Sequence, residues 1–124
     1  MSEDLTHFQH SDMWVLISIS EETEGSDLAD IIGYADALNH SILTVDELNF
    51  GLSRLIHNGY VETLDDRHYR RTDKAKVFFT QHDKPHESAL DRLSRLSSLL
   101  ERQTAAPRCE FHEYVTQADH DKAY

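Results

Sequence analysis

Side chains that could read a base sequence lie close together in one segment of the chain. Asn49, Ser53 and Arg54 carry the amide, hydroxyl and guanidinium groups that hydrogen-bond to base edges in a DNA groove. They fall within a helix predicted over 44–58, off its apolar stripe, so we expect them to point outward. Their residue types suit contacts with DNA.

Three arginines follow this segment. Arg67, Arg70 and Arg71 lie in or beside a hairpin predicted over 60–71. Guanidinium groups at such a place could hold the phosphate backbone of DNA. Alternatively, they could balance the negative charge of the first half of the same protein, and we favour this second interpretation.

No arrangement of residues indicates an enzyme. The sequence has no GxSxG motif, no phosphate-binding loop and no GxGxxG motif. His82 and His86 have the spacing of two imidazoles on one helical face, but Pro85 between them breaks the helix. Cys109 has no cysteine partner and is expected to be an unreactive thiol. We therefore predict no catalytic residue, no cofactor and no metal ligand.

The distribution of charge argues against DNA as the main partner. The net charge is −11, and residues 1–53 hold eleven acidic residues and no lysine or arginine. Positions 67–84 hold six basic residues against Asp73 and Asp83. Because the release of counterions by basic residues supplies most non-specific affinity for DNA, an acidic docking face weakens binding.

Length and composition predict one small domain in the cytoplasm. A chain of 124 residues fits a single core, and no apolar run approaches the roughly 20 residues that span a bilayer. The single cysteine suits a reducing compartment. Acidic residues near the N-terminus disfavour a signal peptide, so we expect neither export nor membrane insertion.

The elements that would position these side chains are mostly helical. Apolar spacing predicts a helix near 27–38, capped by Ser26 or Asp27. The segment Thr44-Val45-Asp46-Glu47 is a capping box at the start of the helix over 44–58, and Gly59 suits the position just beyond its end. Two short strands and a helix from Lys74 to about Gln81 follow.

The two ends of the chain are less regular. Residues 1–11 are polar and are expected to form a loose arm, and Ser11 or Asp12 could cap a segment from Met13 to about Glu22. Period alone leaves that segment open between a buried helix and a strand. A long amphipathic helix is predicted over 88–102, with an apolar face formed by Leu90, Leu93, Leu96, Leu99 and Leu100.

The pattern Glu47-Leu48, Leu52, Leu55, Gly59-Tyr60-Val61, Tyr69-Arg70 and Thr72-Asp73-Lys74 resembles bacterial winged-helix proteins of the MarR and PadR kind. The stretch from Asp36 to Thr44 is also similar to a group of uncharacterised bacterial proteins. The resemblance implies a mainly α fold with a small β-hairpin, in which helices near 27–38 and 44–58 form the helix-turn-helix. It implies a winged-helix domain over 12–82, and a C-terminal helix and tail over 83–124. Arg71 and Ala75 depart from the family's usual apolar residue and glycine.

Two functions stay open at this stage. We favour a non-catalytic interaction domain whose acidic surface binds a protein; the alternative is a small dimeric transcriptional regulator that reads DNA with Asn49, Ser53 and Arg54. The leucine face of 88–102 could cover only its own core. Since terminal helices build the dimer in the families that the chain resembles, we instead expect a homodimer through this helix.

Overall fold

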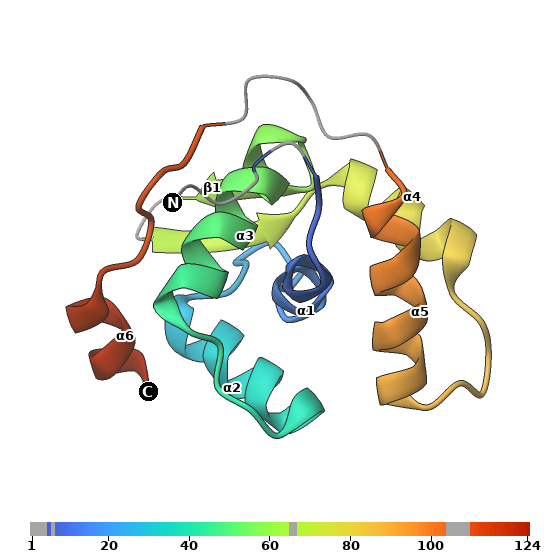
Figure 1. Cartoon of the computed structure of the whole chain (residues 1–124), viewed down its shortest axis with the longest axis horizontal. Coiled ribbons are helices and arrows are strands. Elements are labelled where there is room, and N and C mark those ends of the chain that lie inside the picture. Colours follow the sequence, from blue (N-terminus) through green and yellow to red (C-terminus); the bar gives the residue numbers. More distant parts are fainter. Residues whose placement is uncertain (1–4, 6, 65–66, 104–109) are drawn as a thin grey trace.

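The computed structural model describes residues 5, 7–64, 67–103 and 110–124. Within this part of the chain it has six helices and one antiparallel hairpin, which confirms the predicted mainly α fold with a small β-hairpin (Figure 1). The elements in chain order are α1 (His10–Ile17), α2 (Leu28–Asn39), α3 (Val45–His57), β1 (Val61–Leu64), β2 (His68–Arg71), α4 (Asp73–His82), α5 (Ala89–Glu101) and α6 (Gln117–Ala123).

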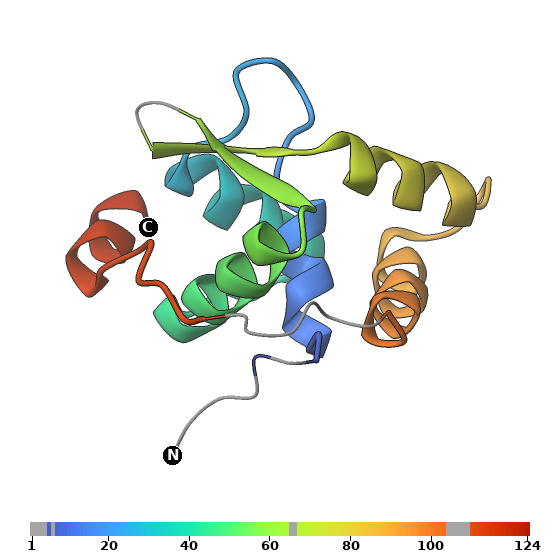
Figure 2. The same ribbon diagram turned by 90° about the horizontal axis from the view of Figure 1, so that it is seen from above.

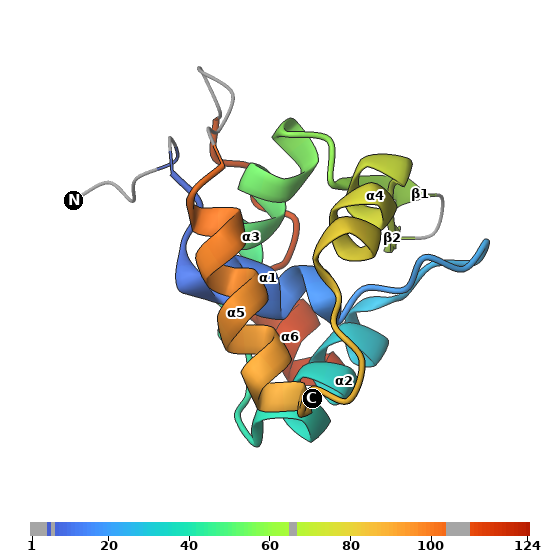
Figure 3. The ribbon, with the colours of Figure 1, turned by 90° about the vertical axis from the view of Figure 1, so that its right-hand side faces the viewer.

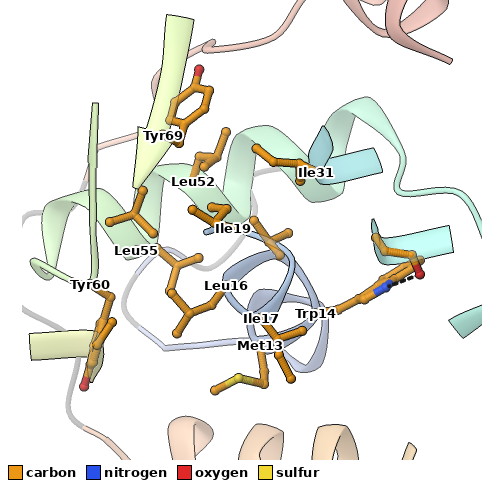
Figure 4. Packing of buried hydrophobic residues seen from close by; sticks show 14 of the residues in the cluster. Met13, Trp14, Leu16, Ile17, Ile19, Ile31, Leu52, Leu55, Tyr60 and Tyr69 are labelled. Atoms are coloured by element: carbon orange, nitrogen blue, oxygen red, sulfur yellow. Dashed lines mark hydrogen bonds between the residues drawn. The ribbon is translucent and has the colours of Figure 1, made fainter. Parts of the chain in front are cut away.

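Helix α1 forms the centre of the molecule and lies between α3 and α5 (Figure 1). Every residue from Met13 to Ile17 is buried, which explains why the sequence of this segment shows no polar face. The indole nitrogen of Trp14 donates a hydrogen bond to the carbonyl of Ala35, 3.0 Å away on α2 (Figure 4). This bond satisfies the one polar atom of a large buried side chain and ties α2 to the core.

The start of α1 differs from the prediction. The helix begins at His10 and is capped by Gln9, so neither Ser11 nor Asp12 is its cap. Asp12 instead lies in the first turn, where its carboxylate accepts a hydrogen bond from the backbone nitrogen of Gln9 at 2.8 Å. The helix ends at Ile17, five residues earlier than expected.

The expected loose arm over 1–11 is wrong for its second half. Phe8 is buried and meets the ring of Tyr60 edge-on at 5.8 Å, and His10 contacts Ser97 of α5 through its ring at 3.0 Å. Residues 1–4 and 6 lie outside the described residues. From Phe8 onward the N-terminal chain is therefore part of the packed domain.

Local signals at the ends of α3 are confirmed. The hydroxyl of Thr44 accepts from the amide of Glu47 at 3.0 Å, and the carboxylate of Glu47 accepts from the amide of Thr44 at 2.9 Å. Gly59 adopts a positive φ of 82° after the helix, a conformation that costs a glycine little. This sharp exit leads directly into β1.

The hairpin is joined to the rest of the domain through the loop before α2. Strand β1 pairs with β2 in a register that places Val61 opposite Arg71 and Leu64 opposite His68. Ser26 exchanges two backbone hydrogen bonds with Tyr69, at 2.7 and 2.8 Å, and so forms a single-residue antiparallel bridge to strand β2. Residues 65 and 66 lie outside the described residues.

A buried ion pair joins α1 to α3. The guanidinium of Arg54 contacts the carboxylate of Asp12 twice, with nitrogen–oxygen distances of 2.6 and 2.9 Å. The two side chains are 1% and 0% exposed. Beside the pair, Gly51 lets the helices approach closely, because a Cβ there would lie 3.2 Å from Val15 and 3.3 Å from the carboxylate of Asp12.

Replacing Gly51 by alanine tests this close approach. Both neighbours are buried and cannot move aside freely, so Gly51→Ala should lower the free energy of unfolding by about 1–3 kcal/mol. Gly33→Ala is the matched control, since Gly33 is an exposed α2 residue with open space around its Cα and should stabilise the protein by about 0.5–1 kcal/mol. Urea unfolding measures both, and an equal gain at the two positions would contradict the tight crossing of α1 and α3.

Candidate interaction site

The predicted DNA-reading side of α3 is covered by the C-terminal part of the same chain. Residues 110–116 run as an extended segment along the helix, before α6 (Figure 2). The amide of Asn49 makes two 2.8 Å hydrogen bonds, one to the carbonyl and one from the backbone nitrogen of Val115. The hydroxyl of Ser53 bonds in the same way to the backbone of His112, at 2.9 and 3.2 Å.

The expectation that Asn49, Ser53 and Arg54 point outward is therefore wrong. Their exposed fractions are 2%, 2% and 1%. Asn49 and Ser53 are buried under the C-terminal segment, and Arg54 is buried against Asp12. A buried polar group needs a hydrogen-bond or ionic partner, and here the partners come from distant parts of the chain. Asp46 and His57 are the only exposed residues of α3.

The arginines of the hairpin are each paired with a carboxylate. Arg67 contacts Asp119 of α6 at 3.0 Å, and Arg70 contacts Glu62 on the neighbouring strand at 3.2 Å. Of these two arginines, Arg67 is the more exposed, with 79% of its side chain open to solvent. Glu62 and Asp119 both lie beyond the acidic stretch over residues 1–53, so these two pairs do not show the hairpin arginines balancing the acidic first half.

Arg71 is held more deeply. Its guanidinium carbon lies 4.4 Å from the ring centre of Phe79, and one of its nitrogens lies 3.3 Å from a carboxylate oxygen of Glu21. Burial lowers the pKa of Arg71, and the carboxylate of Glu21 opposes that shift. The departure from an apolar residue at this position thus has a structural explanation, since the flat guanidinium covers an aromatic face as an apolar side chain would.

The leucine face of α5 is used mainly inside the chain. Leu93, Leu96 and Leu100 are buried against α1, while Leu99 is half-buried and Leu90 is 50% exposed. Figure 3 shows α5 lying across α1. Three of the five leucines predicted at a dimer interface are therefore unavailable to a partner, and the covering of its own core accounts for most of the amphipathic pattern.

An acidic cleft opens between α2 and the chain that follows α1. It has a volume of about 760 Å³, and Glu21, Glu22 and Asp30 line it together with the exposed ring of Tyr34. Gly33, beside Tyr34, leaves the α2 side of the cleft open. Arg71 and Arg92 close the opposite wall, where Arg92 is paired with Asp83 at 2.7 Å.

The acidic surface extends beyond this cleft. We define it as the exposed acids of the loop and α2, which are Glu21, Glu22, Glu24, Asp30 and Asp36. Among these, only Glu21 forms an ion pair with a lysine or arginine of the described residues. The other four therefore leave negative charge on the side of the molecule formed by α2 and the 20–26 loop that no lysine or arginine of the described residues balances.

Within the described part of the chain, no group of three histidine, cysteine or acidic residues is placed to hold a metal ion. The ring of His82 packs against that of Phe78 at the end of α4, and Cys109 lies outside the described residues. No helix found among the described ranges is long and apolar enough to cross a membrane.

Comparison with known proteins gives no relative. The chain matches no protein-family model, no curated protein and no solved structure. The interpretation of its surfaces therefore depends on the geometry described above.

The packing of the tail on α3 was not predicted from the sequence. The only local signal was the alternation of Phe111-His112-Glu113-Tyr114-Val115, which is typical of an extended segment with one covered side. Val115 is buried, and the ring of Phe111 packs against that of Phe50 with ring centres 4.6 Å apart and planes tilted by 51°. The contact partners lie about sixty residues away in the chain, which no periodic pattern reports.

Removing the Asn49 amide should release this segment. In Asn49→Ala the backbone of Val115 loses two buried hydrogen bonds, so we expect a loss of about 1–3 kcal/mol in the free energy of holding 111–115 on α3. Hydrogen exchange at the Val115 amide should accelerate, while amides of α1 keep their protection. Asn39→Ala, at the end of α2, is the matched control and should leave Val115 protected; unchanged exchange in Asn49→Ala would contradict the contact.

Proposed function

We propose that this protein is a non-catalytic interaction domain, built like a winged helix, whose acidic surface binds a basic segment of a partner protein. The observation that carries the proposal is the cleft between α2 and the 20–26 loop. It combines the carboxylates of Glu22 and Asp30, which form no ion pair with a lysine or arginine of the described residues, with the exposed aromatic ring of Tyr34. Charge complementarity steers partners, and an aromatic side chain at the centre of such a surface supplies buried contact area.

The alternative, a regulator that reads DNA, has less support from the side chains it would use. Asn49 and Ser53 bind the chain's own backbone, and Arg54 is neutralised by Asp12. The two residues that α3 leaves exposed are Asp46 and His57. If this helix entered the major groove, the carboxylate of Asp46 would lie against the phosphates. No arginine or lysine of α3 lies beside it to offset the repulsion.

A titration with a basic peptide tests the proposal. The probe is a fluorescent synthetic peptide of alternating arginine and alanine, added to the full chain at low and at moderate salt. We expect binding that weakens with salt. We expect it to weaken about five-fold in Glu22→Gln/Asp30→Asn, because two exposed charge contacts of about 0.5 kcal/mol each are lost. Asparagine at position 30 still accepts the hydrogen bond from the Asp27 amide that caps α2.

The matched control removes the same charge elsewhere. Glu101 and Asp121 are exposed and do not line the cleft, so Glu101→Gln/Asp121→Asn should bind the peptide with almost the affinity of the natural sequence. An equal loss in both double variants would show that only net charge matters and would reject the cleft as the site. Retardation of a DNA fragment at the same salt, abolished by Arg67→Ala, would favour the regulator instead.

A further inference from the structure

The C-terminal segment is held on α3 by contacts that do not depend on most of its side chains. Four hydrogen bonds join Asn49 and Ser53 to the backbone of Val115 and His112. Asn49 and Ser53 are one helical turn apart on the same side of α3, so each binds the backbone of an extended chain at one position. We call these two residues, together with Phe50, the α3 groove.

Beyond the groove, the segment is only loosely attached. Helix α6 has no buried residue. It is held by its contacts with α2, by Ala123 packed partly buried against the core, by the ring of His120 2.6 Å from the carbonyl of Leu43, and by the exposed pair of Arg67 and Asp119. Detaching a segment that has few buried apolar contacts and solvent-exposed polar contacts costs only a small fraction of the free energy of global unfolding.

The seam between the segment and the domain is also incompletely packed. An open cavity of about 320 Å³ lies between them, lined on the domain side by Leu28 and Tyr69 and on the segment side by Tyr114, Val115 and Ala123. Arg67 and Asp119 also line it, so opening the seam breaks their exposed ion pair as well as apolar contacts. Val115 is the buried residue of the segment, and Tyr114 and Ala123 pack partly buried against the core.

We propose that residues 110–124 exchange between two copies of this chain, so that the segment of each copy fills the α3 groove of the other. The inference goes beyond the proposed function. The segment that fills the groove in the structure is carried by every copy, and the contacts made in an exchanged pair are the same as those made within one chain. The ratio of exchanged dimer to closed monomer then depends on how the protein concentration compares with the effective concentration of the segment tethered to its own chain.

An exchanged pair would form a homodimer without using α5. This matters because Leu93, Leu96 and Leu100 are already buried inside the chain. It would also join two acidic surfaces in one particle, which strengthens binding to any partner with two basic segments. A segment from a different protein, or DNA, in the same groove would be a different outcome of the experiment below.

Disulfide trapping between two single-cysteine variants tests the exchange. All variants carry Cys109→Ser; one adds Ser53→Cys and the other adds His112→Cys, because the hydroxyl of Ser53 lies 2.9 Å from the backbone nitrogen of His112. The two proteins are mixed, oxidised gently and run on a non-reducing gel. We expect a covalent dimer whose yield rises with concentration and exceeds that of a mixture of Ser53→Cys with Lys84→Cys, an exposed position away from the groove.

A chain carrying both Ser53→Cys and His112→Cys is the positive control, and its linkage shows that the two positions can be bridged. If that chain links but the mixture gives no more dimer than the Lys84→Cys control, the exchange is rejected. If the double variant does not link, sedimentation of the natural sequence decides. A single species near 14.3 kDa at about 1 mM, the scale of effective concentrations for short tethers, rejects the exchange. A dimer there that a chain ending at residue 109 no longer forms, while its α1 amides keep their protection from hydrogen exchange, supports the exchange, and a dimer that this shortened chain still forms contradicts it.

Discussion

The ion pair between Asp12 and Arg54 is the interaction on which the arrangement of the helices depends. Both groups are almost completely removed from water, and two short contacts join them. Burying either charge alone would cost several kcal/mol, so α1 and α3 can pack only in the register that brings the two side chains together. Gly51 permits the close crossing of the helices beside the pair. The backbone nitrogen of Gln9 donates a further hydrogen bond to the carboxylate of Asp12, which joins the pair to the start of α1.

This pair also decides which residues of α3 face the surroundings. With Arg54 turned toward α1 and the apolar residues toward the core, Asn49 and Ser53 lie on the side taken by the C-terminal segment. The helix is then enclosed on three sides, and its remaining open strip has no lysine or arginine. The acidic surface of α2 and the 20–26 loop is in contrast open, and this difference is the physical basis of the proposed protein-binding function.

The sequence predicted what local interactions determine. The capping box at Thr44 and Glu47, the positive φ at Gly59 and the strands after it depend on residues a few positions apart, and each is present in the structure. The periodic leucines of α5 likewise predicted an amphipathic helix, although its face covers α1 more than it offers a surface to a partner. The relation to winged-helix families stays a prediction, since no comparison tests it.

Contacts between distant segments could not be predicted in this way. Arg54 meets Asp12 across 42 positions, Ser53 meets His112 across 59 and Asn49 meets Val115 across 66. Polar residues off the apolar stripe of a helix were expected to face water, which is the usual case. The three exceptions here are polar groups whose partners come from the two ends of the chain, and periodicity carries no information about such partners.

A double-mutant cycle on the buried pair tests this account most directly. The variants are Asp12→Asn, which still accepts the hydrogen bond from Gln9, Arg54→Met, which keeps the length and apolar stem of the side chain, and the two combined. Urea unfolding should show that Asp12→Asn alone lowers the free energy of unfolding by about 3–5 kcal/mol, and that the combined variant is more stable than Asp12→Asn. Effects that simply add, or an Asp12→Asn protein as stable as the natural sequence, would contradict the claim that this pair sets the packing of α1 on α3.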